Sequence, residues 1–449
     1  MQEFNADFHL HGPRSIGVSK DMDLPNLIHG GRQKGLDLIG TGDCFQPDWL
    51  KYLKSNLEQV NGEYVYDDMR FILQTEVEDE ESVHEIILFP DFEVLEEIKS
   101  KFRPHSKNID AEWGGRPRVN LPPTEIVEIV VDSGGMVGPA HVFTPFKSIF
   151  RQGKFDSLEE AYGGSAKDVH FLELGLSANS DYADRISGLH RLTFMSNSDA
   201  HSPTPSSLGR EFNSFVAEDL SFEEVQKAIK REDGRRFTRN AGFSPKLGKY
   251  NVLFCSKCRK RVLVSIKKPK QDDPVAIFGQ KMKVDDEFIK VQLYSKSEYK
   301  NYLLRINAGK VYCPACKSEG KRSKIKLGVS DRVKLLADRP KGTHPSHRPP
   351  YLDMVPLTEM LRSGMGIKSK NSKTLGRIYD ALIEAHGPEI QLLLNQDVSN
   401  ISAEAFQKQT KRYPDLISTL KGIIIAFRNN EISFKPGGGG TFGQLVFEA

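Results

Sequence analysis

Short apolar runs alternate with amphipathic segments over residues 1–240 of the chain. Segments 92–98 and 124–131 carry apolar residues at helical spacing, and Gly134-Gly135 follows the second segment as a stop signal. Nearly continuous apolar strands that alternate with helices favour an α/β fold with a mostly parallel sheet or barrel. The runs that predict these strands are 36–42, 71–75, 85–89, 136–140, 170–174 and 192–197.

Histidine and carboxylate side chains stand next to these runs, and two pairs share one spacing: His9 with His11, and Asp199 with His201. In an extended strand the side chains at i and i+2 point to the same side, so each pair presents two ligands to one point. In barrels of this kind, ligands gather at the carboxyl ends of strands, and every strand group except that of His84 follows this rule. Histidine with carboxylate is the ligand mixture for Zn²⁺, Mn²⁺ or Fe, whereas carboxylates alone suit Mg²⁺. We therefore predict one metal site formed by His9, His11, Asp43, Glu76, His84, His141, Asp199 and His201.

Together these residues resemble those of the polymerase-and-histidinol-phosphatase (PHP) domain. The resemblance implies a distorted (β/α)7 barrel that holds two or three divalent metal ions (Zn, Mn or Mg) and hydrolyses phosphate esters. In that family a His-x-His opens the site, an Asp-x-His closes it, one carboxylate bridges two metals, and two histidines lie between. The matching residues are His9 and His11, Asp199 and His201, Glu76, and His84 and His141, of which Glu76, Asp199 and His201 are the expected catalytic residues.

Two positions depart from the PHP pattern. The family often has another carboxylate soon after the first His-x-His, and residues 12–19 contain none. Asp43 stands where the family usually has the histidine of a Thr-Asp-His. Both departures concern the third metal position.

Four of the five cysteines form two Cys-x-x-Cys pairs. Each pair turns tightly enough to present two thiolates, and two pairs complete a tetrahedral zinc site. A redox-active pair is the competing interpretation, and the presence of two pairs favours zinc. The long interval between the pairs predicts an inserted β segment with strands at 261–266 and 288–293. The expected ligands of this structural zinc are Cys255, Cys258, Cys313 and Cys316, and the remaining thiol, Cys44, is expected to be structural.

The net charge of +3 conceals an uneven distribution. Residues 1–240 hold 26 Lys and Arg against 41 Asp and Glu, whereas residues 241–350 hold 26 against 9. An acidic lobe can hold cations and a basic lobe can hold a polyanion, as a metal-dependent nuclease requires. The residues that we expect to contact DNA are Arg210, Lys321, Arg322 and Lys324, with Arg235, Arg236 and Arg239 extending the basic surface.

Three further segments resemble one particular family of PHP-domain proteins. Residues 40–43, 208–213 and 248–250 are similar to endonuclease Q, a family that nicks DNA on the 5′ side of deaminated bases (deoxyuridine, deoxyinosine) and abasic sites. To be recognised, a damaged base should leave the base stack and enter a pocket of the protein. For the lining of this pocket the sequence offers only loop and aromatic candidates: Phe45, Trp49, Trp113 and Arg116. The match covers nearly the whole chain and implies three domains: a PHP catalytic barrel at 1–240, a four-cysteine zinc-ribbon domain at 241–345 and a small helical C-terminal domain at 346–449.

Two other functions compete with a DNA repair nuclease. A PHP-type phosphatase acting on a small phosphate ester would use the same barrel but would need neither a zinc ribbon nor a basic lobe. A non-catalytic DNA-binding adaptor would hold metal only structurally, and the near-complete ligand set argues against it. Damaged DNA is the expected partner, and the sequence does not reveal a sliding clamp or another repair factor.

The mean hydropathy of −0.45 and the lack of an apolar run near the ~20 residues that span a bilayer predict a protein that does not enter the membrane. The acidic start is unlike a signal peptide, and the paired cysteines suit a reducing compartment, so we expect a cytoplasmic protein.

In the C-terminal part of the chain, the patterns of segments 372–383 and 406–427 predict helices. The glycine-rich stretch 436–443 lacks the lysine of a nucleotide-binding loop and predicts a turn before a strand at 444–447.

Overall fold

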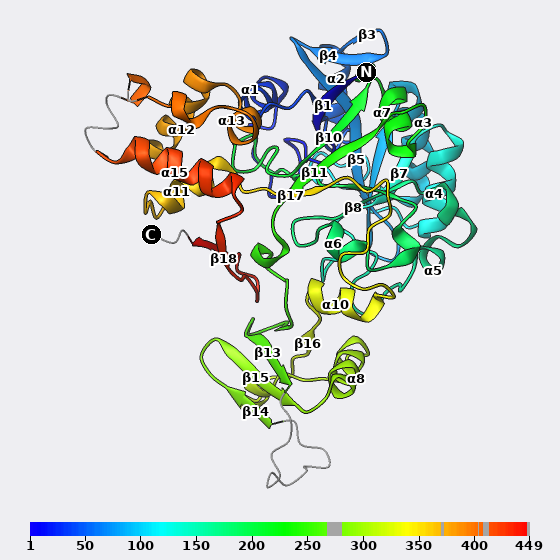
Figure 1. Ribbon diagram of the computed structural model, residues 1–449. Helices are drawn as coiled ribbons and strands as arrows, with labels where there is room; N and C mark the ends of the chain where they lie inside the picture. Colours follow the sequence, from blue (N-terminus) through cyan, green and yellow to red (C-terminus); the bar gives the residue numbers. More distant parts are fainter. Residues whose placement is uncertain (267–280, 370–371, 403, 407–412, 447–449) are drawn as a thin grey trace.

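The structure is a computed structural model and describes residues 1–266, 281–369, 372–402, 404–406 and 413–446. Figure 1 shows three lobes: an α/β body, a group of helices from the end of the chain beside it, and a smaller lobe below that carries a second sheet. No helix within the described residues is long and apolar enough to cross a membrane.

A ten-stranded sheet forms the wall of the α/β body. Its centre is β1 (Gln2–Asp7), which is parallel to β2 (Leu38–Gly40), and β2 is in turn parallel to β5 (Met69–Glu78). The other strands of the body are β3 (Glu58–Val60), β4 (Glu63–Tyr66), β6 (His84–Phe89), β7 (Met136–Pro139), β8 (Phe171–Glu173), β9 (Thr193–Met195), β10 (Phe212–Ala217), β11 (Arg236–Gly242) and β17 (Tyr351–Asp353).

The sheet is mixed, whereas the apolar pattern predicted a mostly parallel one. Strand β6 runs antiparallel to both β5 and β7, and β10 runs antiparallel to both β1 and β11. The connection between β5 and β6 is only residues 79–83, and a parallel crossover needs a dozen residues or more. Strands β8 and β9 form a separate parallel pair that contacts β7 and β11.

Amphipathic helices cover the outer face of the wall (Figure 1). In α3 (Phe92–Phe102), Asp91 caps the first turn by accepting a hydrogen bond from the Val94 amide, and the spaced side chains Leu95 and Ile98 are fully buried. The predicted helix at 124–131 is also confirmed, as α4 (Pro123–Asp132). The remaining helices of the body are α1 (Leu24–Lys34), α2 (Pro47–Asn56), α5 (Leu158–Tyr162), α6 (Ser180–Ala183) and α7 (Phe222–Lys230).

The smaller lobe contains the cysteine pairs and a five-stranded sheet. The two predicted strands of its inserted segment are confirmed as β13 (Arg261–Ile266) and β15 (Phe288–Leu293), which pair in parallel. The other elements of the lobe are β12 (Phe254–Cys255), β14 (Lys281–Val284), β16 (Ile325–Lys326), α8 (Lys296–Asn307), α9 (Pro314–Ser318) and α10 (Val329–Leu336).

The end of the chain folds into helices that pack on the body. The predicted helix at 372–383 is α12 (Lys373–His386), and the helical part of 406–427 that the structure describes is α15 (Leu416–Arg428), since 407–412 lie outside the described residues. The remaining helices are α11 (Leu357–Gly364) and α13 (Glu389–Leu394), and a hairpin follows, made of β18 (Ser433–Lys435) and β19 (Gln444–Val446). The glycine-rich stretch is the turn of this hairpin, as its sequence predicts.

Contacts cross between the lobes. Strand β17 adds to the edge of the large sheet beside β11, so residues 351–353 belong to the body in space. Lys34 of α1 forms an ion pair of 2.8 Å with Glu389 of α13, and both side chains are fully buried. One continuous hydrophobic cluster accordingly runs from the body into the terminal helices. The hairpin contacts the smaller lobe, where the Arg261 guanidinium donates to the carbonyl of Pro436 at 3.1 Å.

Candidate metal centre

Five of the predicted ligands reach one edge of the wall from four strands. His9 and His11 follow β1, His141 follows β7, and Asp199 follows β9 after a short loop. Glu76 lies near the end of β5. These strand ends face the same way, which is why side chains far apart in the sequence meet.

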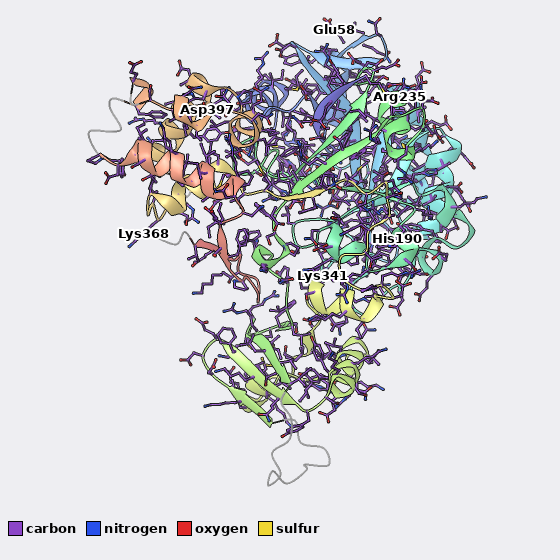
Figure 2. All side chains as sticks on the ribbon, viewed as in Figure 1. Glu58, His190, Arg235, Lys341, Lys368 and Asp397 are labelled. Atoms are coloured by element: carbon purple, nitrogen blue, oxygen red, sulfur yellow. The ribbon has the colours of Figure 1, made fainter. Side chains whose placement is uncertain are left out.

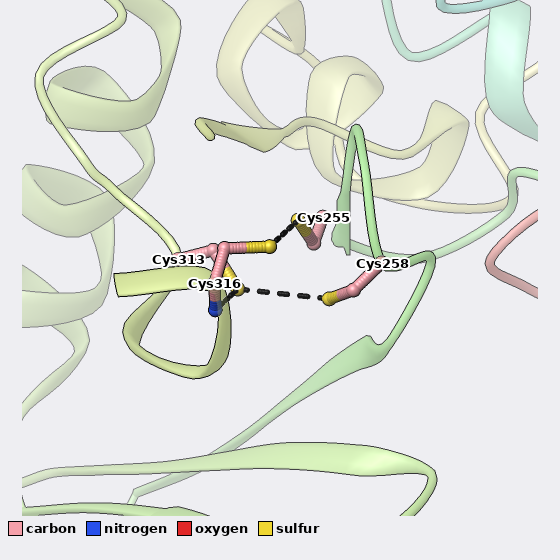
Figure 3. Close-up of side chains that lie close together, drawn as sticks. All are labelled: Cys255, Cys258, Cys313 and Cys316. Atoms are coloured by element: carbon pink, nitrogen blue, oxygen red, sulfur yellow. Dashed lines mark hydrogen bonds between the residues drawn. The ribbon is translucent and has the colours of Figure 1, made fainter. Parts of the chain in front are cut away.

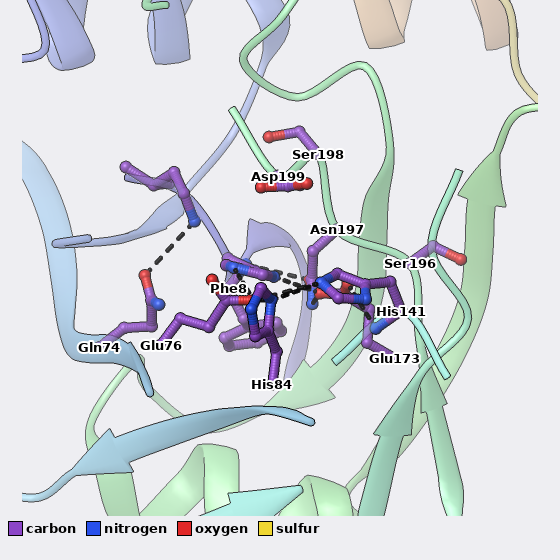
Figure 4. Close-up of polar contacts among 12 residues, drawn as sticks. Phe8, Gln74, Glu76, His84, His141, Glu173, Ser196, Asn197, Ser198 and Asp199 are labelled. Carbon is purple, nitrogen blue, oxygen red and sulfur yellow. Dashed lines mark hydrogen bonds and ion pairs between the residues drawn. The ribbon is translucent and has the colours of Figure 1, made fainter. Parts of the chain in front are cut away.

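His84 lies at the start of its strand, and it is therefore an exception to the rule that ligands gather at the carboxyl ends of strands. The antiparallel pairing of β6 with β5 places His84 opposite Glu78, so the start of β6 lies at the edge where β5 ends. Figure 4 shows His84 pointing toward Glu76 and His141. The direction of a single strand therefore decides that His84 joins the other ligands.

The donor atoms form two groups, in each of which all atoms lie within 4.8 Å of one another. Glu76 stands between the groups. One of its oxygens lies 2.9 Å from His84 Nδ1 and 3.2 Å from His141 Nε2, and the other lies 3.7 Å from His11 Nε2. A carboxylate in this position can ligate two cations at once. The groups are His9 with His11 and Asp199, and Glu76 with His84 and His141.

Three predicted ligands adopt a left-handed backbone conformation. The φ angle is +37° at Asp43, +32° at His141 and +47° at Asp199. This region is uncommon for residues other than glycine, and such strain clusters at functional sites, where the surrounding structure holds it in place. The backbone at these positions turns sharply at the end of a strand, which aims each side chain back across the edge of the wall.

Two buried carboxylates orient the first pair of histidines. Glu173, at the end of β8, lies 2.8 Å from Nδ1 of His9, and Asp43 lies 3.0 Å from Nδ1 of His11. Burial by itself lowers the pKa of His9, but the charge and hydrogen bond of Glu173 raise it to about 9. A carboxylate on Nδ1 fixes the ring and turns Nε2 toward the centre, as in metal sites with a histidine–carboxylate pair. Glu173 was not among the predicted ligands, although its place at the end of a predicted strand was a usable signal.

Several polar atoms at the centre are buried without a hydrogen-bond partner among the described residues. They include Nε2 of His9 and Oδ1 of Asp43. Leaving a buried polar atom unpaired costs about 1–3 kcal/mol, so these atoms need a ligand. Imidazole nitrogen with carboxylate oxygen is the donor set that Zn²⁺ and Mn²⁺ prefer, and the residues therefore fit divalent metal ions.

Arg116 and His201 border the two groups. The Arg116 guanidinium contacts the Glu76 carboxylate and lies 3.2 Å from His11 Nε2. Burial raises the pKa of Glu76, but His84 and Arg116 together hold it well below its usual value. His201 donates from Nδ1 to the Asp199 carbonyl at 2.9 Å, which leaves the lone pair on its Nε2. Its ring packs edge-on against that of His11 at 4.6 Å between centroids, outside both groups of ligands.

An open cavity of about 320 Å³ adjoins the ligands. The body contributes His84, His141 and Asp199 to its lining, and other lobes contribute aromatic rings. Tyr250 comes from the segment before the smaller lobe, and Phe442 comes from the hairpin turn at the end of the chain. Three separate regions of the sequence therefore enclose the mouth of the metal centre.

The four paired cysteines converge in the smaller lobe (Figure 3). The sulfur of Cys255 lies 3.7 Å from that of Cys316, and Cys258 lies at the same distance from Cys313. A tetrahedron with Zn–S bonds of ~2.3 Å has edges of ~3.8 Å, so the four sulfurs have the spacing of a zinc site. Burial raises the pKa of Cys255, but hydrogen bonds from the Ser323 hydroxyl and from the amides of Lys257 and Cys258 together lower it to about 7, which favours the thiolate.

Solved structures share this architecture along the whole chain. The lesion-specific endonuclease PfuEndoQ from Pyrococcus furiosus is 34% identical, and the match covers 99% of this chain and 96% of that one with a TM-score of 0.78. The chain belongs to the endonuclease Q family. A second endonuclease Q structure, in complex with a 27-mer duplex that carries an abasic lesion at the active site, matches 100% of this chain and 97% of that one at 34% identity and a TM-score of 0.79.

Two further relatives are uncharacterized proteins. YqxK of Bacillus subtilis is 27% identical over 464 residues, covering 99% of this chain and all of that protein. MJ0043 of Methanocaldococcus jannaschii is 34% identical over 311 residues, which is 68% of this chain but 31% of that longer protein. A family model described as the MJ0043 C-terminal domain matches residues 356–409. Membership of the endonuclease Q family confirms the predicted class of enzyme, a metal-dependent hydrolase.

Two of the candidates for a base pocket are part of the core. Phe45 is fully buried against Phe89 and Phe102. Trp49 is buried as well, and its indole nitrogen donates to the carbonyls of Thr41 and Gly42. Their aromatic character in a predicted loop makes both candidates for a base pocket, but the sequence does not show that these rings turn inward. Trp113 is partly exposed near the metal centre, and Arg116 lies within it.

Two of the arginine assignments are changed by the structure. Arg210 donates to the carbonyls of Ser198 and Asp199 and so supports the loop that carries Asp199, a predicted metal ligand. Arg235 pairs with Glu224 on α7, and Figure 2 labels it on the upper side of the body, far from the smaller lobe below. The smaller lobe lies within the basic stretch 241–350 and is therefore the basic lobe. The prediction that Arg235 extends the basic surface is therefore wrong, because β11 separates it from that lobe by the length of a strand. Lys321, Arg322 and Lys324 are exposed on the basic lobe.

Proposed function

We propose that this protein nicks duplex DNA on the 5′ side of deaminated bases, namely deoxyuridine and deoxyinosine, and of abasic sites. The observation that supports the proposal is the arrangement of Glu76 between two groups of ligands at the mouth of an open cavity. The similar structure with an abasic duplex at its active site supports damaged DNA as the partner.

The ligands divide the work of holding the metal ions. His9, His11 and Asp199 would hold one ion, and Glu76, His84 and His141 would hold a second, with Asp43 and His201 as the further predicted ligands. Divalent cations bound there supply Lewis acidity to a phosphate oxygen and lower the pKa of a bound water. Glu173 and Asp43 keep the Nε2 atoms of His9 and His11 directed at the centre.

Positive side chains around the cavity suit a phosphodiester. Arg116 can donate two hydrogen bonds to the scissile phosphate in the planar geometry that guanidinium offers. Lys147 and Lys249 line the same cavity. These residues would hold a DNA backbone across the strand ends, with its phosphate next to the ligands.

The basic lobe provides a second contact with the backbone. A groove of about 630 Å³ on this lobe is lined by Ser256, Lys257, Arg322 and Lys324 among others. The Arg322 guanidinium stacks on Tyr312 at 4.7 Å, which holds it in place at the surface. Cations held in this way contact phosphates without reading sequence, so we expect binding through this groove to weaken as salt concentration rises.

Incubation of the protein and Mn²⁺ with a labelled duplex that carries one deoxyuridine tests the proposal. We expect one nick 5′ to the deoxyuridine, with 3′-hydroxyl and 5′-phosphate ends, and none in the matched undamaged duplex. Asp199→Asn should abolish the nick while DNA binding persists, because it removes a ligand and leaves the basic lobe unchanged. Asp67→Asn, at a carboxylate whose side chain is 64% exposed, is the matched control. Rapid hydrolysis of a small phosphomonoester without any nick would instead identify a phosphatase.

A further inference from the structure

A loop at the rim of the metal centre presents an isolated apolar side chain to solvent. We call residues 12–21, which follow His11, the rim loop. Ile16 at its tip is 80% exposed, the largest value for any large apolar side chain in the part of the chain that the structure describes. Single exposed apolar residues are common at protein surfaces, but this one lies at the rim of the candidate metal centre, where Trp113 is exposed as well.

The rim loop is fixed at both ends by residues of the metal centre. The Gly12 amide donates to Asp43 Oδ2 at 2.9 Å, and the Ser15 hydroxyl contacts the same carboxylate. At the other end, the Ser19 amide donates to the carbonyl of His201 at 2.8 Å. The position of the loop is therefore tied to two predicted ligands.

The tip of the rim loop is a tight turn. The Val18 amide donates to the Ser15 carbonyl at 3.2 Å, and Gly17 has φ of +81°. A positive φ at the third position is typical of a type II turn and is available to glycine without strain. Ile16 occupies the corner before it, and an added side chain at Gly17 would meet no atom within 4 Å, so the tip stands clear of the body.

A second loop supports the first. Ser15 and Gly114 form a backbone bridge, and the Gly114 amide donates to the Arg14 carbonyl at 3.1 Å. Trp113 is 46% exposed, and the Arg14 guanidinium lies over its ring at 5.3 Å. The rim thus combines exposed apolar groups with a cation that suits a phosphate backbone.

We propose that Ile16 is a wedge that enters the base stack of duplex DNA beside the damaged nucleotide. The inference rests on the proposed function. A nucleotide must leave the stack to bring its flanking phosphate to ligands that line a cavity, and proteins fill the gap with a rigid apolar side chain. Ile16 meets this requirement because it is apolar, exposed, and held on a backbone anchored to the residues that bind the metal. Arg14 beside it is placed to contact the adjacent phosphate.

The test combines a nicking assay with the fluorescence of 2-aminopurine placed next to a deoxyuridine, which rises when the base unstacks. Fluorescence is measured in the Asp199→Asn background, so that cleavage is not required for the signal. We expect Ile16→Ala to remove most of the rise and to slow nicking at deoxyuridine by about tenfold or more, which corresponds to about 1.4 kcal/mol. Nicking at an abasic site should slow less, because no base has to be unstacked.

Two further variants serve as controls. Ile16→Leu keeps the apolar volume and should restore both signals. Val60→Ala removes a 47% exposed apolar side chain from β3, away from the metal centre, and should behave as the unmodified protein. A protein that nicks deoxyuridine at full rate with Ile16→Ala, or that unstacks the base equally well with it, overturns the wedge. A protein that does not nick but still shows an Ile16-dependent rise retains the wedge and loses the proposed cleavage.

Discussion

Glu173→Gln is the most direct test of how the histidines of the candidate metal centre are kept in orientation. The Glu173 carboxylate is fully buried and lies 2.8 Å from His9 Nδ1, while it accepts hydrogen bonds from Asn197 Nδ2 at 2.9 Å and the His141 amide at 3.1 Å. It thus links one histidine from each group of ligands. Glutamine has one acceptor oxygen, so its amino group would face the Nδ1–H of His9 or the amide of His141.

The size of the effect follows from what the pair does. If the amino group of the glutamine faces Nδ1 of His9, the imidazole has to move its proton to Nε2, which is the nitrogen that a metal ion would need, or rotate away from the centre. Loss of such a partner lowers metal affinity about 10–100-fold, which is about 1.4–2.8 kcal/mol. The substitution should also lower the pKa of His9 from about 9, since Glu173 raises it more than Glu76 or Asp199 does.

The assay is a titration of nicking activity with Mn²⁺, together with calorimetric measurement of Mn²⁺ binding to the metal-depleted candidate metal centre. Glu125→Gln, at a glutamate in the first turn of α4, is the matched control and should not change either curve. Folding is checked by circular dichroism. If Glu173→Gln binds Mn²⁺ with unaltered affinity while the fold is intact, Glu173 does not orient His9 and the reasoning is refuted.

Three other perturbations have defined outcomes. Glu389→Ala leaves Lys34 buried without its partner and should lower the free energy of unfolding by about 3–5 kcal/mol in a urea titration; an unchanged midpoint would contradict this. Burial raises the pKa of Asp79 from 3.8 to about 7, so its stabilising contribution is complete below pH 3.8 and is lost as the pH rises through 7. Asp79→Asn should therefore raise the free energy of unfolding by roughly 1–3 kcal/mol at pH 8 and by less at pH 5, whereas an equal effect at both pH values would exclude ionisation as the cause. Cys313→Ser should remove about one zinc per chain, measured by atomic absorption, and unchanged zinc content would show that the cysteines do not bind it.

The local patterns of this chain predicted what depends on neighbouring residues. Strands and helices followed from apolar periodicity, as α3 and β13 illustrate. The spacing of His9 with His11 made a shared ligand site predictable, because side chains two residues apart in a strand necessarily face the same side. The two Cys-x-x-Cys pairs indicated a zinc site because each short turn brings two thiolates together.

The tertiary structure alone decided which distant groups meet. The antiparallel direction of β6 brings His84 to the other predicted ligands. The position of β8 beside β7 makes Glu173 the partner of His9. It also turned Phe45 into the core and left Ile16 exposed on a fixed loop. Periodicity records how a segment divides its side chains between two faces, but strand order and direction depend on contacts between remote segments. The sequence therefore predicts the ligands, while the packing of the strands determines the partners that orient them.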